Sequence, residues 1–187
     1  RWSDRVGPGP TAVLERYRAL KGLPSRPLSG GLINDTYIVE GAATKAVVQR
    51  LHPVFEGQVN EDIDVITRHI AARGLVTPRL IRADDGSAFV EHDGRPWRSL
   101  TFVEGESFAR LRSPAMARAA GALVGRFHAA LSDLEHTYAF SRGNVHDTKR
   151  HLTALEEALA THPSHPLFDE VQALSAPLLD AGRTLPD

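Results

Sequence analysis

Residues 28–39 read LSGGLINDTYIV, a loop with two adjacent glycines that runs directly into a short β-type segment. Gly30 and Gly31 allow the backbone to bend closely over a bound phosphate and to present its amides to the phosphate oxygens. An ordinary hairpin turn explains the same glycines equally well. The stretch does not match G-x-x-x-x-G-K followed by Ser or Thr, so it is not a P-loop.

The half of the chain around this loop is rich in strand patterns. Apolar and turn residues predict five strands, at residues 36–39, 46–51, 79–82, 88–91 and 97–103. An Asp-Gly turn at residues 84–87 predicts a hairpin between the third and fourth strands, and a second turn at residues 92–95 leads into the fifth. We therefore expect an antiparallel sheet.

Helical spacing appears twice in this half. Residues 11–20 carry apolar side chains at helical intervals before the glycine loop. Between the second and third strands, isoleucines recur at three and four residues and predict an amphipathic helix over residues 60–73. Asn60 fits the N-cap of this helix, and Gly74 fits the glycine that often follows a helix end. The prediction is a five-stranded sheet with one inserted helix.

The second half of the chain is rich in helix patterns. Ser113 followed by Pro114 is typical of a helix start. Two further helices are predicted, one that starts at Asp147 or Thr148 and one that follows His165-Pro166. The predicted fold class is α+β, with a sheet domain at residues 1–104 and an incomplete helical domain at residues 105–187.

Composition narrows the function. The chain has 187 residues, of which 42% are hydrophobic, and contains no apolar run that could span a bilayer. The absence of cysteine excludes disulfides, zinc-thiolate sites and thiol catalysis, and it fits a cytoplasmic protein. A formal net charge of -1 gives no general attraction to nucleic acid or to anionic membranes, so neither is an expected partner.

The segment Val48-Gln49-Arg50 could carry nucleotide chemistry. Strand alternation places Val48 and Arg50 on one face of the sheet and Gln49 on the other. A kinase nucleotide site needs a small apolar residue under the adenine and, two residues later, a cation that reaches the α- and β-phosphates. Val48 and Arg50 fit these two positions. The alternative is a strand-end arginine that meets a surface carboxylate.

Two other features complete the candidate site. An acidic residue on the inserted helix is needed to hold the cation, and Glu61 is the candidate, with the neighbouring acids Asp62 and Asp64 as alternatives. An acid in a first helical turn also stabilises the helix dipole without further function. Residues 100–105, LTFVEG, end the last strand at the boundary between the two halves. A hinge at that point can offer a backbone carbonyl and amide to adenine.

Together these features resemble the aminoglycoside phosphotransferase and choline-kinase-like superfamily. The resemblance is carried in order along the chain by Gly30–Tyr37, Val48-Gln49-Arg50, Gly74–Pro78, Phe102–Gly105 and Gly125–His128. Within the superfamily the chain looks most like the bacterial N-acetylhexosamine 1-kinases, on Ile33–Tyr37, Gln49-Arg50 and His146-Asp147-Thr148.

The resemblance implies a protein-kinase-like N-terminal lobe followed by the first helices of an α-helical C-terminal lobe. It assigns to nucleotide binding Gly30, Gly31, Asn34, Asp35, Val48, Arg50, Glu61, Thr101 and Val103. Arg50 would stand in place of the usual lysine with Glu61 as its partner, and the Thr101 carbonyl and Val103 amide would meet adenine. Because a planar guanidinium contacts phosphate oxygens differently from an ammonium, altered nucleotide affinity is expected.

One departure from the superfamily concerns catalysis. The superfamily carries a His-x-Asp catalytic loop and a later Asp that holds magnesium, but none of the nine histidines here has an aspartate two residues later. The sequence therefore predicts no catalytic residue and no metal site within these 187 residues. We expect a fragment or partial form of a longer enzyme, inactive by itself, that uses ATP and Mg²⁺.

The implied activity is transfer of the ATP γ-phosphate to a hydroxyl of a small acceptor. A sugar or amino sugar is the first expectation, and choline, homoserine and aminoglycosides stay open, as does the oligomeric state. A non-catalytic nucleotide-binding or interaction module is the alternative from a different class, and an unrelated α+β protein is the third.

Overall fold

The computed structural model describes residues 9–28, 33–141 and 147–184, and the chain divides into two compact units, residues 1–140 and 141–187. The first unit contains the sheet with α1 (Thr11–Leu14), α2 (Val59–Ala72) and α3 (Pro114–Leu131). Helix α3 contacts α2 and therefore groups with the sheet. The predicted boundary between residues 104 and 105 stays a prediction. No helix in the described ranges is long and apolar enough to cross a membrane.

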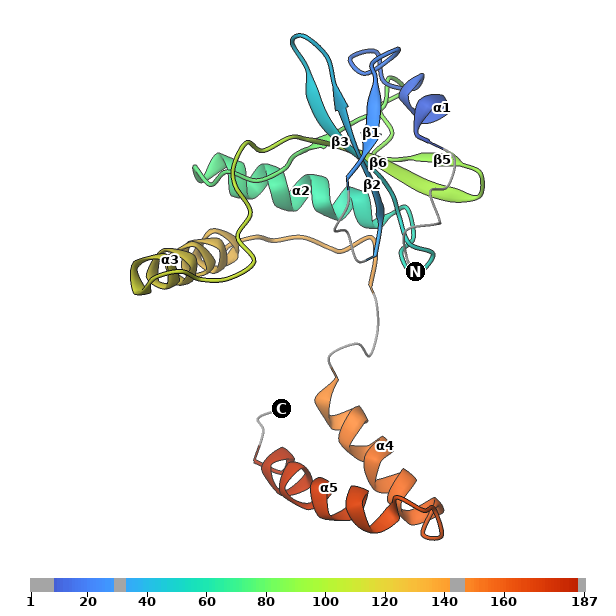
Figure 1. Cartoon of the computed structure of the whole chain (residues 1–187), viewed down its shortest axis with the longest axis vertical. Helices are drawn as coiled ribbons and strands as arrows, with labels where there is room; N and C mark the ends of the chain where they lie inside the picture. The colour runs from blue at the N-terminus through green and yellow to red at the C-terminus, as the bar shows by residue number, and fades with distance from the viewer. Residues whose placement is uncertain (1–8, 29–32, 142–146, 185–187) are drawn as a thin grey trace. The chain divides into compact units, whose positions relative to one another are not determined.

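The sheet has the strand order β1-β2-β3-β6-β4, with every neighbouring pair antiparallel, and β5 also pairs with β6 (Figure 1). The strands are β1 (Ser25–Pro27), β2 (Asp35–Glu40), β3 (Lys45–Arg50), β4 (Leu80–Ile81), β5 (Val90–His92) and β6 (Arg95–Thr101). The α+β class and the antiparallel sheet with an inserted helix are confirmed.

The strand count and one hairpin were predicted wrongly. The sheet has six strands, because residues 25–27 add a short edge strand that ends in a proline, a residue tolerated at sheet edges. β4 and β5 do not pair with each other; they lie one after the other along the same edge of β6. The Asp-Gly turn instead closes a loop between them, in which the Gly86 amide donates to the Ala83 carbonyl over 2.9 Å. The turn at Asp93-Gly94 does form a hairpin, with positive φ at both residues.

Strand register divides the sheet into two faces. Residues directly opposite each other in paired strands point to the same side, and successive residues point to opposite sides. One side, which we call the α1 face, includes Tyr37, Val48 and Trp97, and these pack with the α1 segment in one buried core. The other side, which we call the α2 face, includes Thr36, Gln49 and Arg98.

The α1 segment is less helical than its spacing predicts. Helix α1 ends at Leu14 and the chain continues in turns, yet the predicted apolar positions are the ones that become buried, namely Val13, Leu14, Tyr17 and Leu20. Burial raises the pKa of Tyr17 to about 12, with a smaller contribution from the nearby Asp85 carboxylate. The segment therefore covers Tyr37, Val48 and Trp97 on the α1 face.

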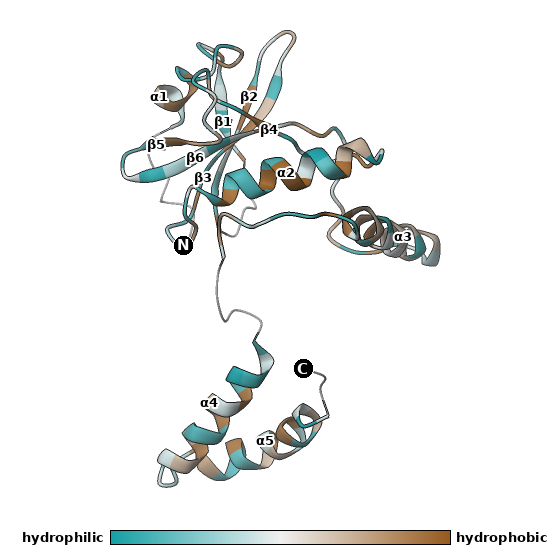
Figure 2. Ribbon diagram, turned by 180° about the vertical axis from the view of Figure 1, so that it is seen from behind, coloured by the Kyte–Doolittle hydropathy of each residue, from teal (hydrophilic) through white to brown (hydrophobic). Residues whose placement is uncertain are grey.

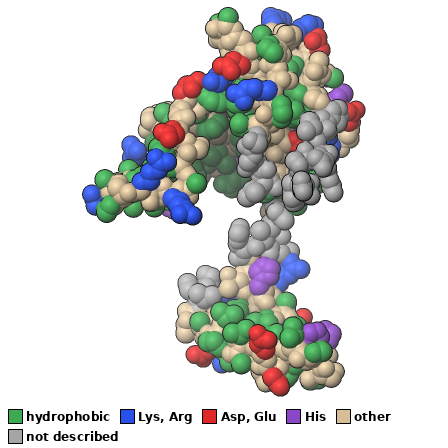
Figure 3. All heavy atoms as spheres, in the orientation of Figure 1, with side chains coloured by type: hydrophobic (Ala, Val, Ile, Leu, Met, Phe, Trp, Pro, Cys, Tyr) green, Lys and Arg blue, Asp and Glu red, His purple; other side chains and the backbone are tan. Residues whose placement is uncertain are grey.

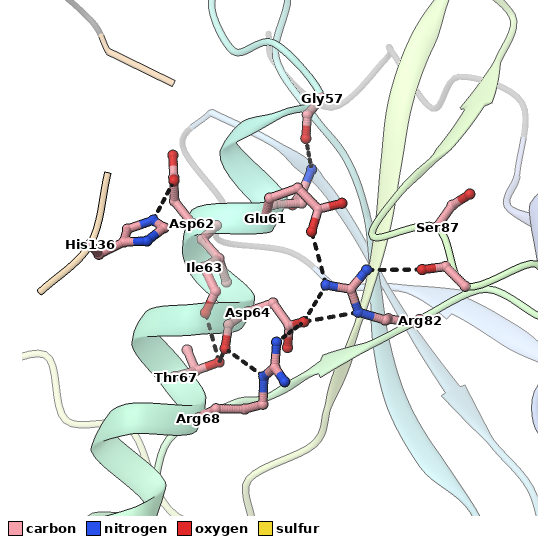
Figure 4. A network of polar contacts seen from close by, with 12 residues as sticks. Gly57, Glu61, Asp62, Ile63, Asp64, Thr67, Arg68, Arg82, Ser87 and His136 are labelled. Carbon is pink, nitrogen blue, oxygen red and sulfur yellow. Dashed lines mark hydrogen bonds and ion pairs between the residues drawn. The ribbon is translucent and has the colours of Figure 1, made fainter. Parts of the chain in front are cut away.

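Helix α2 is joined to the sheet by charged groups (Figure 4). Arg82, which follows β4, donates to Glu61 over 2.8 Å and through Nε to Asp64 over 2.9 Å. Arg68 adds a second guanidinium to the buried Asp64 carboxylate, at 2.8 Å. Because Ile81 packs into the core of the α1 face, the next residue, Arg82, leaves toward the opposite side, and this places α2 over the α2 face. Asn60 is not the N-cap; its amide donates to the Gly57 carbonyl over 2.8 Å, one turn earlier.

Asp62 on the same helix fixes the end of the first unit. Its side chain is 5% exposed, and its carboxylate accepts from the amides of Ala139 over 2.8 Å and Phe140 over 3.0 Å, while Nε2 of His136 lies 2.8 Å away. Burial alone would raise the pKa of Asp62, but these hydrogen bonds outweigh it and bring the pKa below the ordinary 3.8.

The helix starts of the second half were predicted correctly. The Ser113 hydroxyl accepts from the Met116 amide over 3.1 Å with Pro114 in the first turn, and Asp147 caps α4 (Thr148–Thr161) through the Arg150 amide at 2.9 Å. In the second unit α4 packs against α5 (Phe168–Gly182). Each of these helices carries both hydrophilic and hydrophobic residues (Figure 2).

Exposed apolar side chains gather on both units. On α3, Leu123 and Val124 are 51% and 54% exposed, and on α5, Leu174 and Leu178 are 64% and 59% exposed. Figure 3 shows such hydrophobic side chains clustered on the surface of the second unit. Surfaces of this kind are typical of faces that another part of a protein covers.

Replacing Asp62 by asparagine should destabilise the first unit by about 1–3 kcal/mol at pH 7, because charge-assisted hydrogen bonds to three groups are weakened. Since the pKa of Asp62 is lowered in the folded state, its contribution is fully present above the unfolded value. The contribution falls as the pH decreases through the folded value. Urea titration followed by the fluorescence of buried Trp97 measures the free energy of unfolding.

Asp180→Asn is the matched control, because that side chain is 85% exposed. A deficit in Asp62→Asn that stays constant from pH 7 down to pH 3, or no deficit at all, would contradict the role of the charge.

Candidate functional site

The end of the glycine-bearing loop is fastened to the end of β3. Gly30 and Gly31 lie outside the described residues. Among the residues that follow them, the Asn34 side-chain carbonyl accepts from the His52 amide over 2.9 Å. The Asp35 carboxylate accepts from Nε of Arg50 over 2.8 Å, with Nη2 at 2.6 Å. Two predicted site residues, Asp35 and Arg50, are thus brought together, but as an ion pair that neutralises both.

Val48 and Arg50 share a face, as strand alternation predicts, but it is the α1 face. Val48 is 0% exposed in the core under the α1 segment, so it has no surface to offer to adenine. The Arg50 guanidinium lies 6.0 Å from the centre of the Trp97 ring, and its side chain is 18% exposed. Arg50 is thus a strand-end arginine that pairs with a carboxylate, that of Asp35, as the alternative interpretation of the sequence predicted.

Glu61 is not a partner of Arg50. Its carboxylate binds Arg82, and within the described part of the chain no hydrogen bond or ion pair joins Glu61 to Arg50. The reason is the sheet itself: Arg50 points to the α1 face, and α2 lies over the other. The expected pairing of cation and helix acid is therefore corrected, since the arginine that holds the helix acid comes from the end of β4.

The predicted hinge leaves backbone donors without an internal acceptor among the described residues, and the Val103 amide is one of them. The Thr101 amide donates to the Arg79 carbonyl over 2.8 Å, and the Thr101 hydroxyl accepts from the Arg79 amide over 2.9 Å. Two residues later, the Val103 amide donates to no acceptor in the described part of the chain, and the residue is 39% exposed. Such an amide can bind a ligand nitrogen without first losing an internal hydrogen bond.

Lys45 holds the hinge in place. Its ammonium lies 4.2 Å from the centre of the Phe102 ring and donates to Glu104 over 3.3 Å. The hydrogen bond with Glu104 makes the largest contribution to the pKa of Lys45, which is raised even though desolvation lowers it; Glu40 contributes in the same direction as Glu104. The lysine therefore stays charged and links β3 to the segment after β6.

The α2 face carries a polar row that the sequence patterns did not identify. Nε of Arg98 donates to the Gln49 side-chain carbonyl over 2.9 Å, and the Gln49 amide group donates to the Thr36 hydroxyl over 3.1 Å. These three residues stand opposite one another on β6, β3 and β2. Strand alternation identified Gln49 as a residue of this face, but only the register of β3 with β6 brings Arg98 beside it.

Metal ligands do not cluster in the parts of the chain that the structure describes: residues 9–28, 33–141 and 147–184 contain no group of three or more His, Cys, Asp or Glu side chains that could hold an ion.

Solved structures of phosphotransferases share this fold. An aminoglycoside phosphotransferase from Alicyclobacillus acidocaldarius matches with a TM-score of 0.58 at 14% identity, over 98% of this chain and 54% of that one. A spectinomycin phosphotransferase in complex with ADP and spectinomycin matches with a TM-score of 0.55 at 12% identity, over 95% and 58%. A microcompartment-associated aminopropanol kinase matches with a TM-score of 0.52 at 16% identity, over 80% and 55%.

The chain thus spans little more than half the length of the structures that it matches. At the level of sequence, residues 25–186 match the profile of the phosphotransferase enzyme family, from β1 through α5. This match covers most of the chain and both compact units. The chain belongs to the phosphotransferase enzyme family.

Proposed function

We propose that the chain is the nucleotide-binding part of an ATP-dependent kinase that transfers the ATP γ-phosphate to a hydroxyl of a small metabolite. The observation that carries the proposal is the free Val103 amide at the end of β6, on a sheet of the order β1-β2-β3-β6-β4 with α2 inserted after β3. Family membership supports the same reading, and one of the structural neighbours is a complex with ADP.

The adenine is assigned to the hinge in this proposal. A purine edge carries a hydrogen-bond acceptor beside a donor, and a strand end offers an amide and a carbonyl at matching spacing. Thr101 and Val103 keep these roles. Val48 does not, because it is fully buried, and Asn34 with Asp35 act by fastening the loop end rather than by contacting the nucleotide.

The acceptor is proposed to be a sugar or amino sugar. The support is the resemblance to N-acetylhexosamine 1-kinases at Ile33–Tyr37 and Gln49-Arg50. The structural neighbours widen the range of acceptors, since their names specify an aminoglycoside, spectinomycin and aminopropanol. Mg²⁺ enters the proposal only as the ion that accompanies ATP, because the described residues hold no cluster for it.

Mg-ADP should raise the melting temperature of the chain of residues 1–187, because a ligand that binds only the folded state stabilises it by mass action. The same chain should show no ATP-dependent phosphoryl transfer, since it has no His-x-Asp sequence. Differential scanning fluorimetry and an ADP-release assay measure the two properties. Absence of any shift at millimolar Mg-ADP would remove the nucleotide proposal, whereas binding without turnover by a protein of its relatives' full length would favour the non-catalytic module.

Val103→Pro should weaken ADP binding by about 2- to 10-fold, because it removes the one backbone donor assigned to adenine, worth about 0.5–1.5 kcal/mol. Val103→Ala keeps the amide and serves as the matched control. Isothermal titration calorimetry gives both dissociation constants. Equal affinity of the two variants for ADP would show that the Val103 amide does not bind the base.

An acceptor panel tests the sugar assignment with a protein extended to the length of the structural neighbours. We expect ATP-dependent ADP release with N-acetylhexosamines to exceed that with choline, homoserine, aminopropanol or an aminoglycoside. The controls lack the acceptor or ATP. A preference for one of the amino alcohols or for the aminoglycoside would reject the sugar while leaving the kinase proposal in place.

A further inference from the structure

Several arginines lie in the strands of the sheet or directly beside them, and two of these are neutralised by carboxylates within the described residues. Arg50 binds the Asp35 carboxylate, and Arg82 binds both Glu61 and Asp64. Arg98, in the middle of β6, has no ion pair in the described part of the chain, and its one hydrogen bond goes to the neutral side chain of Gln49. Two partly buried sheet arginines, Arg95 and Arg98, therefore meet no carboxylate in the described residues. Arg95 is held through Nε and Nη2 by the Leu51 carbonyl, whereas Arg98 is held through Nε alone.

This missing partner matters because Arg98 is half-buried. Burial lowers the pKa of Arg98, because removal from water disfavours the charged form of the guanidinium. No carboxylate in the described residues stabilises that charged form. Buried charges in folded proteins are normally paired, because an unpaired one costs several kcal/mol. A guanidinium held in this way is typical of a site whose anion arrives with a ligand.

The guanidinium is also oriented and reachable. The Gln49 side chain accepts a hydrogen bond from Nε of Arg98 only, and it donates one to the Thr36 hydroxyl. These two hydrogen bonds in a row fix the plane of the guanidinium. The two terminal nitrogens have no partner and do not belong to the fully buried unpaired atoms, so they keep exposed surface. A planar fork with two free nitrogens matches two oxygens of one phosphate.

The position of the row favours a nucleotide phosphate over other anions. Thr36 is the second residue of β2, directly after the loop that contains the two glycines, and Gln49 is the residue next to Arg50 on the opposite face. The row lies on the α2 face, whereas the face that carries Val48 is sealed by the α1 segment. Arg98 and the Val103 amide come from the same strand and the residues that directly follow it.

We infer that Arg98, held by Gln49 and Thr36, is the residue that binds the polyphosphate of the nucleotide, in the place that the sequence pattern assigns to Arg50. The inference rests on the proposed nucleotide-binding function and adds the phosphate-binding residue and its face to it. No covalent step is involved: the guanidinium donates two hydrogen bonds to phosphate oxygens and supplies the missing counter-charge.

Arg98→Met removes the charge and keeps an unbranched apolar stem. Isothermal titration calorimetry with pyrophosphate, Mg-ADP and adenosine should show about a 10- to 100-fold weaker affinity for the two phosphorylated probes and an unchanged affinity for adenosine. Arg118→Met, on the exposed surface of α3, is the control for a lost positive charge. Unchanged affinity of Arg98→Met for Mg-ADP would overturn the inference and leave the proposed function intact.

Gln49→Glu tests the same point without removing the arginine. A carboxylate in place of the Gln49 carbonyl gives Arg98 an internal counter-charge at the same position, so the melting temperature should rise by about 2–4 °C. The affinity for pyrophosphate and Mg-ADP should fall at the same time, because the guanidinium is already neutralised. If Arg98 served stability alone, a rise in melting temperature would not be accompanied by weaker phosphate binding. A fall in melting temperature or an unchanged phosphate affinity would count against the inference.

The remaining outcomes separate the two proposals. A loss of Mg-ADP binding in Arg50→Met but not in Arg98→Met would return the phosphate to Arg50 and reject the inference. Binding of pyrophosphate that depends on Arg98, without binding of adenosine, would support the inference while rejecting the adenine hinge. Failure of the unsubstituted chain to bind either pyrophosphate or Mg-ADP would reject both.

Discussion

The alternation of side chains along β3 is the constraint on which the rest of the site depends. Val48 points into a core that the α1 segment closes, and Gln49 points to the side on which α2 lies. A shift of one residue in register would exchange the two sides completely. The antiparallel pairing of β3 with both β2 and β6 fixes that register, so the assignment of each polar residue to a face follows from backbone hydrogen bonds rather than from its own chemistry.

Charge compensation then distinguishes the arginines that carboxylates of the fold already pair from Arg98, which meets no carboxylate in the described residues. Asp35 and Arg50 close the end of the glycine-bearing loop onto β3, and Arg82 joins α2 to the edge of the sheet through Glu61 and Asp64. Each of these guanidiniums already has its anion. The Asp64 carboxylate is buried, so removing its arginine partner would leave a buried charge uncompensated.

Much of the fold could be predicted from local patterns, and the site could not. The helix start at Ser113-Pro114, the cap at Asp147 and the tight turn at Asp93-Gly94 are local hydrogen-bonding decisions that a few residues determine. The pairing of β4 and β5 with β6, rather than with each other, depends on contacts distant in sequence. Arg98 becomes a neighbour of Gln49 for the same reason, since 49 residues separate them. Alternation correctly placed Val48 with Arg50, but only the packing of the α1 segment reveals that their face is closed.

The two faces also separate stability from binding. The α1 face concentrates the large buried side chains, including Trp97 and Tyr17, and at its margin Arg50 and Asp35 pair with each other. The α2 face carries an apolar row of Ile38, Val47, Leu100 and Leu80 and, beside it, a polar row that ends in a guanidinium without a carboxylate partner in the described residues. Natural folds keep such a costly arrangement mainly where binding relieves it. A sheet with a packed core on one face can therefore hold such a cation in a fixed orientation on the other, because the core keeps the strands, and with them Thr36, Gln49 and Arg98, in register.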